Sequence, residues 1–185
     1  MLNVAGKSED EFVELARRAA PLEGVAGLEL NLSCPNVAGG LDFSAKPETT
    51  ERIVARCRAV YPLPLFAKLS PNVGDIVPIA QAAERGGADA LSCVNTYLGT
   101  AIDWRRRKTI FPRTVAGLSG PAIKPMALLT VMRTAAAVKI PVIGIGGIAK
   151  AEDVLEYLVA GATAVQIGTA CFWDPRVPER ITDRL

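Results

Sequence analysis

Histidine is absent from the 185-residue sequence. This absence excludes Ser-His-Asp and Cys-His catalysis, and it excludes every metal site built on histidine. Acid–base chemistry in this chain must therefore come from Cys, Lys, Asp, Glu or Tyr side chains.

Cysteines are few, and they do not form a ligand pattern. The four cysteines lie 23, 36 and 78 residues apart, with no CxxC pair. This spacing argues against zinc or iron–sulfur ligation, so we predict free thiols and no metal site.

Long apolar runs and an excess of one charge are also lacking. No run approaches the roughly 18 residues of a membrane span, and the amino terminus has no signal-peptide pattern. Lys and Arg number 21 against 19 Asp and Glu. We therefore expect a cytoplasmic protein with neither a nucleic-acid nor a membrane partner.

The sequence does contain an alternation of short apolar runs and amphipathic segments. Near-continuous apolar runs suit parallel strands that are buried on both faces. The predicted strands cover residues 28–32, 65–69, 90–94, 142–144 and 164–167, with the end of one more strand at 2–5. The predicted helices cover residues 9–20, 49–60, 76–85, 124–138 and 151–160.

Repeating strand–helix units predict either a doubly wound sheet or a (β/α)8 barrel. Glycines follow the last two strands, at Gly146-Gly147 and Gly168, as in the phosphate sites of many barrels. The segment 144–149 also fits a dinucleotide-binding fingerprint, but the next strand lacks the acidic residue which that site needs. The sequence thus favours the barrel.

The length predicts an incomplete barrel. A full barrel usually needs about 250 residues, and the tail 181–185 reads as the inside of a helix. We expect residues 1–185 to form a single partial (β/α)8 domain that lacks the first strands and the end of the last helix.

One interval between strands is too long for a simple unit and must contain an excursion at about 98–120. Its run Trp104-Arg-Arg-Arg-Lys108 could be a basic binding patch. Because the surrounding chain has no basic bias, a solvated loop or hairpin is the preferred interpretation.

Polar side chains lie where the predicted strands end, which is where barrel active sites form. Cys34 lies in a loop after a strand, whereas Cys57, Cys93 and Cys171 read as structural. Lys68 stands inside a strand and needs either an acidic partner or an anionic cofactor, of which the glycine loops favour the cofactor. Asn31, Asn36 and Asn95 could be turn residues or could together bind a planar polar ligand.

These residues lie in segments that closely resemble the class 1 dihydroorotate dehydrogenases. The signature loop is Leu28-Glu-Leu-Asn-Leu-Ser-Cys-Pro-Asn-Val37, and the other matching segments follow in family order across essentially the whole chain. They are Ala67-Lys-Leu-Ser-Pro-Asn-Val73, Val94-Asn-Thr96, Gly117-Leu-Ser-Gly-Pro-Ala-Ile-Lys-Pro125, Gly146-Gly147 and Gly168-Thr169.

The resemblance implies an FMN-containing barrel that oxidises dihydroorotate to orotate in pyrimidine biosynthesis. It implies that Cys34 removes a proton from C5 of the substrate and that Lys68 lies beside the flavin ring, where its cation offsets the charge of the reduced form. It assigns substrate binding to Asn31, Asn36, Asn95 and Thr96. It assigns FMN binding to Asn31, Lys68, Val94, Gly120, Gly146, Gly147, Gly168 and Thr169.

Two segments resemble the NAD-linked type rather than the fumarate-linked homodimer: Lys68-Leu-Ser-Pro-Asn-Val73 and Gly117-Leu-Ser-Gly-Pro121. In that type a partner subunit carries FAD and a [2Fe–2S] cluster and passes electrons to NAD. The resemblance thus implies a homodimer or a heterotetramer.

Two alternatives stay open. The flavin domain of dihydropyrimidine dehydrogenases shares the Asn-Leu-Ser-Cys-Pro core, although Asn36 speaks mildly against it. The chain could also be a truncated barrel without activity, because the family's earlier strands supply further flavin and substrate contacts.

Overall fold

The computed structural model describes residues 1–33 and 43–185, and its centre is a parallel sheet. The six strands are hydrogen-bonded in the order β1-β2-β3-β4-β9-β10, with every pair parallel. Their bounds are β1 Leu2–Val4, β2 Leu28–Asn31, β3 Leu65–Lys68, β4 Ala90–Cys93, β9 Val142–Ile145 and β10 Ala164–Gln166.

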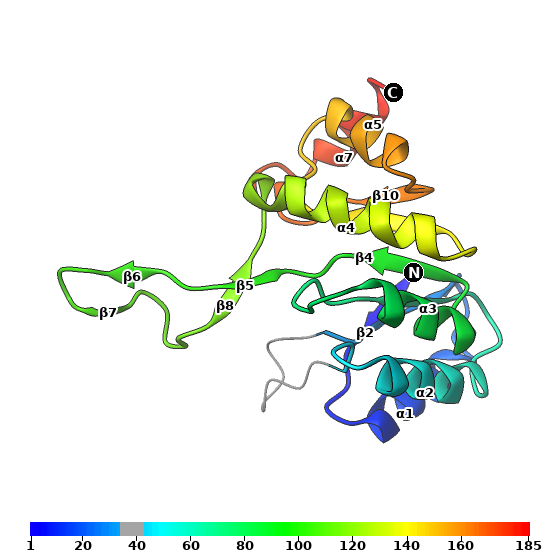
Figure 1. The fold of residues 1–185 in the computed structure, drawn as a ribbon. Helices are drawn as coiled ribbons and strands as arrows, with labels where there is room; N and C mark the ends of the chain where they lie inside the picture. The colour runs from blue at the N-terminus through cyan, green and yellow to red at the C-terminus, as the bar shows by residue number, and fades with distance from the viewer. Residues whose placement is uncertain (34–42) are drawn as a thin grey trace.

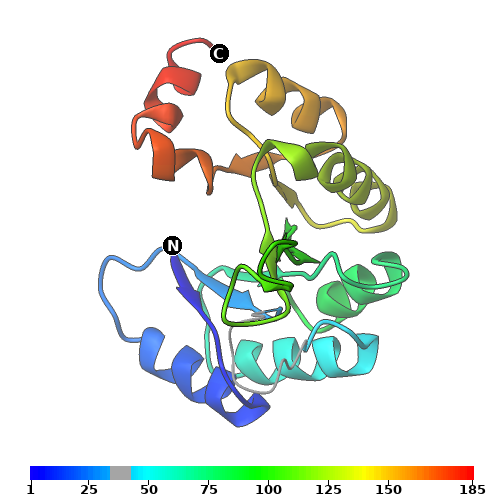
Figure 2. The same ribbon diagram turned by 90° about the vertical axis from the view of Figure 1, so that its left-hand side faces the viewer.

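Helices separate successive strands of the sheet, two short helices follow the last strand, and the helices lie outside the curled sheet (Figures 1 and 2). They are α1 Glu9–Ala19, α2 Pro47–Arg58, α3 Val77–Arg85, the 3₁₀ turn η1 Pro121–Ile123, α4 Lys124–Ala137, α5 Ala151–Val159, α6 Ala170–Trp173 and α7 Val177–Thr182.

The strand order matches the sequence-based prediction. Strands near 28, 65, 90, 142 and 164 are parallel neighbours in chain order, and the segment near residue 2 adds an edge strand. The described sheet has no reversal of strand order, which a doubly wound fold requires. A curled parallel sheet with outer helices fits an incomplete α/β barrel.

The helix boundaries follow local chemistry. The hydroxyl of Ser8 accepts a hydrogen bond from the Glu11 N–H at 3.2 Å, which caps α1. Helix α2 begins at Pro47, two residues before the predicted start, because proline suits the first helical turn. Of residues 181–185, which the sequence places inside a helix, Ile181 and Thr182 belong to α7 and the helix ends there.

The two faces of the strands differ in chemistry because alternate side chains point to opposite faces. Leu28, Leu30, Leu65, Ala67 and Leu91 are fully buried and belong to the core that includes helix residues such as Phe12 and Ile53. The alternate positions of the same strands carry Glu29, Asn31, Lys68 and Ser92. The inner face of the sheet therefore carries a group of polar side chains across β2, β3 and β4.

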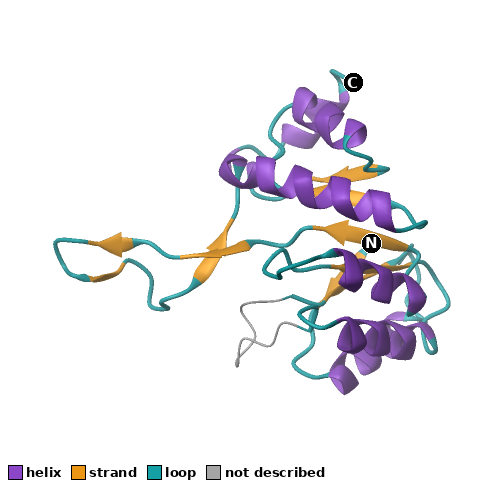
Figure 3. Cartoon of the chain, viewed as in Figure 1, coloured by secondary structure: helices purple, strands orange, loops and turns teal. Residues whose placement is uncertain are grey.

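The predicted excursion is an arm of two antiparallel ribbons that projects from the carboxyl end of β4 (Figures 1 and 3). One ribbon pairs β5 Tyr97–Gly99 with β8 Ala116–Leu118, and the other pairs β6 Ile102–Asp103 with β7 Lys108–Thr109. The basic run lies at the turn of the outer ribbon, where Arg105 stacks on exposed Trp104 at 4.5 Å from the ring centroid. The hairpin interpretation is thus confirmed.

Residues 1–33 and 43–185 contain no helix that is both long and apolar enough to cross a membrane.

Candidate functional site

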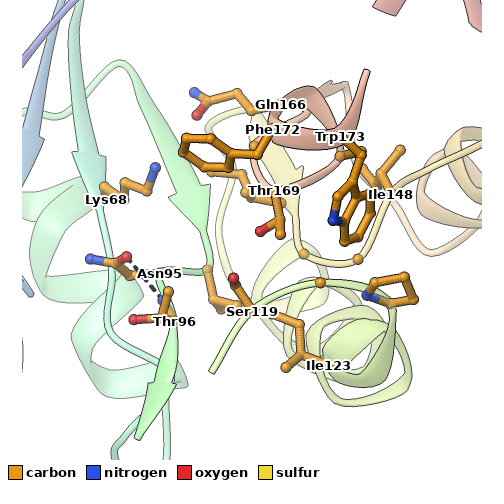
Figure 4. A pocket seen from close by; sticks show the side chains of 18 residues that line it. Lys68, Asn95, Thr96, Ser119, Ile123, Ile148, Gln166, Thr169, Phe172 and Trp173 are labelled. Atoms are coloured by element: carbon orange, nitrogen blue, oxygen red, sulfur yellow. Dashed lines mark hydrogen bonds between the residues drawn. The ribbon is translucent and has the colours of Figure 1, made fainter. Parts of the chain in front are cut away.

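A pocket opens at the carboxyl ends of β3, β4, β9 and β10 (Figure 4). Barrel active sites occupy this end of the sheet. The structure brings nine of the predicted site residues together in its lining: Lys68, Val94, Asn95, Thr96, Gly120, Gly146, Gly147, Gly168 and Thr169. Their roles there stay predictions.

The remaining predicted residues lie beside this pocket or outside the described part of the chain. Cys34 and Asn36 fall in the undescribed segment 34–42. Asn31 ends β2 and accepts a hydrogen bond from the Asn95 amide at 3.0 Å. Asn31 thus joins the pocket through Asn95.

The amide of Asn95 is fixed on both sides. Its nitrogen also donates to the Ser33 hydroxyl at 2.9 Å, and its oxygen accepts from the Thr96 N–H at 2.9 Å. These bonds orient Asn95 and the adjacent Thr96 at the pocket wall (Figure 4).

Lys68 is the cation of the pocket lining and points into the space (Figure 4). Its side chain is 17% exposed, and its ammonium nitrogen lies 3.6 Å from Oε2 of Glu29. The sequence favoured an anionic cofactor over an acidic partner, but the structure supplies the acidic partner. Glu29 escaped the prediction because its strand was treated as a continuous apolar run.

Glu29 is a buried carboxylate, 2% exposed, that connects its own strand β2 to four others. Oε1 accepts hydrogen bonds from the Ser92 hydroxyl at 2.5 Å and from the Gln166 amide at 2.8 Å, and Oε2 accepts one from Asn3. Burial by itself raises the pKa of Glu29. The charge of Lys68 and the three hydrogen bonds outweigh burial, so the pKa lies below its ordinary value.

Two glycine loops form the opposite wall. Gly147 has φ +71°, and a Cβ placed there would come within 2.9 Å of the Gly120 carbonyl oxygen. A side chain is therefore excluded where these loops approach. At Gly168 a Cβ would meet nothing within 4 Å, so this backbone borders open space in the pocket.

A second ion cluster lies behind the glycine loop. The Lys124 ammonium contacts Oδ1 of Asp153 at 2.6 Å and Oε2 of Glu156 at 2.8 Å. Oδ2 of Asp153 accepts hydrogen bonds from the N–H groups of Ala149 and Lys150 at 2.9 and 3.1 Å. The Asp153 carboxylate therefore fixes the loop to the first turn of α5.

Lys124, Asp153 and Tyr157 together hold the glycine loop against α5, and we call these three residues the clamp. Burial by itself raises the pKa of Asp153. The hydrogen bond and charge of Lys124, with the hydrogen bonds from the loop N–H groups, lower this pKa by more than burial raises it, so the net shift is downward. Burial raises the pKa of Tyr157, which stays a phenol and donates to the Gly146 carbonyl at 2.6 Å.

Two aromatic side chains were missed by the sequence-based prediction. Phe172 and Trp173 of α6 are 89% and 64% exposed and line the pocket (Figure 4). The available signal was the adjacent aromatic pair Phe172-Trp173, four residues after Gly168. Large exposed aromatics beside a pocket are typical of binding sites.

The other cysteines are placed as predicted. Cys57 and Cys93 are fully buried, and burial raises the pKa of each thiol to about 12. Neither is suited to act as a base or nucleophile near neutral pH. Cys171 is partly buried. Residues 1–33 and 43–185 hold no group of three or more metal-ligating side chains.

Comparison with known proteins agrees with this geometry. The family model described as "Dihydroorotate dehydrogenase" matches residues 1–185. A solved structure, the DHODH of Eimeria tenella in complex with ferulenol, superposes with a TM-score of 0.78 at 23% identity. The superposition covers 95% of this chain and 52% of that one, and it supports the fold.

Curated relatives are more similar in sequence. The catalytic subunit of dihydroorotate dehydrogenase B (NAD(+)) from Trichlorobacter lovleyi is 53% identical over 98% of this chain, and that from Halalkalibacterium halodurans is 48% identical over 99%. A putative dihydroorotate dehydrogenase A (fumarate) from Solibacter usitatus is 52% identical over 99%. The chain spans 60% of the length of each of these relatives. It belongs to the dihydroorotate dehydrogenase family.

Proposed function

We propose that this chain provides the FMN and substrate site of an oxidoreductase that converts dihydroorotate to orotate in pyrimidine biosynthesis. The observation that carries the proposal is one pocket in which Lys68, Asn95 and two glycine loops meet at the carboxyl ends of the strands. Family membership gives this pocket its chemistry. Residues 1–185 then form one partial FMN-binding barrel domain.

The pocket residues fit a flavin phosphate ester. The close approach of the loops at Gly147, together with the open backbone at Gly168, leaves N–H groups that a phosphate could meet without side-chain interference. We assign FMN binding to these glycines with Gly120, Gly146, Thr169 and Val94, and to Asn31 and Lys68. When bound, FMN supplies the acceptor for the hydride that leaves C6 of the substrate.

The chain's own residues bind the substrate and move its proton. We assign substrate binding to Asn31, Asn36, Asn95 and Thr96, because their amides and hydroxyl both donate and accept hydrogen bonds. Cys34 takes the proton from C5. An ordinary thiol has a pKa of about 8.5, so modest stabilisation of the thiolate makes it a competent base in a chain without histidine.

We also propose an electron route beyond this chain. Relatives from Trichlorobacter lovleyi and Halalkalibacterium halodurans are named as NAD(+)-dependent catalytic subunits, which supports a partner subunit here. That partner would carry FAD and a [2Fe–2S] cluster in a cytoplasmic heterotetramer. The Solibacter usitatus relative supports the fumarate-linked homodimer as the alternative. Assaying the holoenzyme with NAD and with fumarate distinguishes the two acceptors.

Anaerobic mixing of the FMN-loaded holoenzyme with dihydroorotate tests the proposed reaction. We expect dihydroorotate to bleach the visible absorption band of the flavin and dihydrouracil to leave it unchanged. Bleaching by dihydrouracil alone would instead support a dihydropyrimidine dehydrogenase activity. A protein that retains no flavin, or whose flavin neither compound reduces, would contradict the proposal.

The role of Cys34 is tested by Cys34→Ser, with Cys57→Ser as the matched control. Serine is a much weaker acid than cysteine and has no histidine in this chain to activate it. We expect flavin reduction to collapse near neutral pH and to recover partly in alkali, while orotate still binds. Reduction at the parent rate near neutral pH would remove Cys34 from its assigned role.

A further inference from the structure

Glu29 is a charged side chain in the interior of the sheet, where strands usually contribute apolar residues. Its carboxylate receives hydrogen bonds from β1, β4 and β10 and an ion pair from β3, so each oxygen has two polar contacts. A buried, fully contacted carboxylate of this kind keeps its negative charge.

A structural role alone explains this cluster poorly. Replacing a buried ion pair with well-packed apolar residues is often neutral or stabilising, so stability alone does not account for a charged pair at this place in the sheet. The cluster also lies next to the proposed FMN site, because Lys68 and Gln166 both line the pocket. Glu29 therefore reaches the site through two of its four partners.

The contact between Glu29 and Lys68 leaves the cation available to the pocket. The separation of 3.6 Å between the Lys68 nitrogen and the Glu29 oxygen is longer than that of a close charge-assisted hydrogen bond. Among the described residues 1–33 and 43–185, Lys68 forms an ion pair with Glu29 alone. The ammonium can thus face a ligand while Glu29 attracts it from behind.

We propose that Glu29 is a positioning residue: its carboxylate holds the Lys68 ammonium at the pocket wall and offsets part of the positive charge that Lys68 directs at the bound cofactor. This inference rests on the proposed function. A cation near the flavin stabilises its anionic reduced form, and a neighbouring carboxylate weakens that effect. Glu29 thereby keeps the flavin potential below the value that Lys68 alone would give.

The test is the midpoint potential of the bound flavin in Glu29→Gln, measured in the holoenzyme with Glu51→Gln as the matched control. Glu51 is an ion-paired glutamate on α2 that contacts Arg85 and takes no part in the pocket. We expect Glu29→Gln to favour the reduced flavin by roughly tenfold, as for removal of one buried charge nearby. For a two-electron couple this is a rise of about 30 mV. The control should leave the potential unchanged.

A double variant separates positioning from a direct effect of the Glu29 charge. Ser92, Gln166 and Asn3 still donate hydrogen bonds to Glu29 when Lys68 is replaced, and these bonds favour its ionised form. A direct effect of the Glu29 charge on the flavin would therefore persist without Lys68, whereas an effect exerted through Lys68 would disappear. In a Lys68→Met background Glu29→Gln should therefore leave the potential unchanged. Equal shifts in the two backgrounds, or no shift in the parent background, would overturn the inference.

If Glu29→Gln does not fold or does not bind FMN, a milder variant and a crystal structure still test the inference. Glu29→Asp keeps the charge but moves it one methylene away from Lys68, so we expect a smaller rise than in Glu29→Gln. A parent protein without FMN would refute the proposed function. Positioning is then read from the crystal structure of Glu29→Gln: a displaced Lys68 ammonium supports it, and an unmoved one overturns it.

Discussion

Two lysine–carboxylate clusters lie around the pocket, and they are built for different tasks. Lys68 lines the pocket and contacts Glu29 at 3.6 Å, whereas Lys124 is absent from the lining and contacts Asp153 at 2.6 Å and Glu156 at 2.8 Å. The close cluster fixes a loop, and the looser pair presents a cation. A buried lysine–carboxylate pair can thus serve either the site or its framework, and the geometry distinguishes the two.

The largest expected effect comes from Lys68→Met. If Lys68 stabilises charge that develops on the flavin, its loss should slow flavin reduction by dihydroorotate by about 100-fold, the scale seen for other lost electrostatic donors. Stopped-flow reduction of the FMN-loaded protein measures this rate. Lys124→Met is the matched control, and its bound flavin should be reduced within about threefold of the parent rate. Equal slowing in both variants would contradict the different roles assigned to Lys68 and Lys124.

Asp153→Ala should have the next largest effect, on stability and cofactor retention. It removes the Lys124 contact and leaves two loop N–H groups without their acceptor. We expect the free energy of unfolding to fall by about 2–3 kcal/mol and FMN to bind more weakly. Urea unfolding and flavin titration measure the two changes. An unchanged midpoint of unfolding would show that the clamp is dispensable.

Tyr157→Phe tests the same glycine loop by removing a single hydrogen bond, the one from the Tyr157 hydroxyl to Gly146. The hydroxyl donates to the Gly146 carbonyl at 2.6 Å in a buried environment. We expect a loss of about 1–2 kcal/mol of unfolding free energy, because the carbonyl keeps its burial but loses its donor. Thermal unfolding measures this change, and no shift of the melting temperature would argue against a clamped loop.

Lowering the pH should reduce the stability that both clusters contribute, and this is the smallest of the expected effects. The pKa values of Glu29 and Asp153 lie below their ordinary values of 4.5 and 3.8, so their stabilising contributions are complete above those values and are lost as the pH falls through the lowered ones. Glu29→Gln removes one of these two contributions. Urea unfolding from about pH 7 to about pH 3 should then show a shallower decline than the parent. Parallel declines would contradict a charged Glu29 in the folded protein.

The sequence predicted most of the fold because the strands and helices carry strong local signals. Apolar runs located the strands, and sequential βα units fixed their parallel order. Glycine turns and strand-end polar residues placed Lys68, Asn95, Gly147 and Gly168 at one pocket. The end of the last helix was placed a few residues too late, at 185 instead of Thr182, because helical periodicity does not indicate where a short helix ends.

Glu29 and the clamp residues were missed for different physical reasons. Glu29 alternates with Leu28 and Leu30, which is the pattern of a strand with one polar face, but a single strand does not reveal its cross-strand partners. Lys124, Asp153 and Tyr157 meet only when α4 and α5 pack behind the glycine loop. Such contacts between helices follow from tertiary packing and leave no short motif.

The flavin midpoint potentials of Lys68→Met and Lys124→Met, measured side by side in the holoenzyme, test the difference between the two clusters most directly. We predict that Lys68→Met lowers the potential, because the reduced flavin loses a nearby cation. Lys124→Met should leave the potential of its bound flavin unchanged while weakening FMN binding. A lowered potential in Lys124→Met, or an unchanged one in Lys68→Met, would contradict the division of roles between the two lysines.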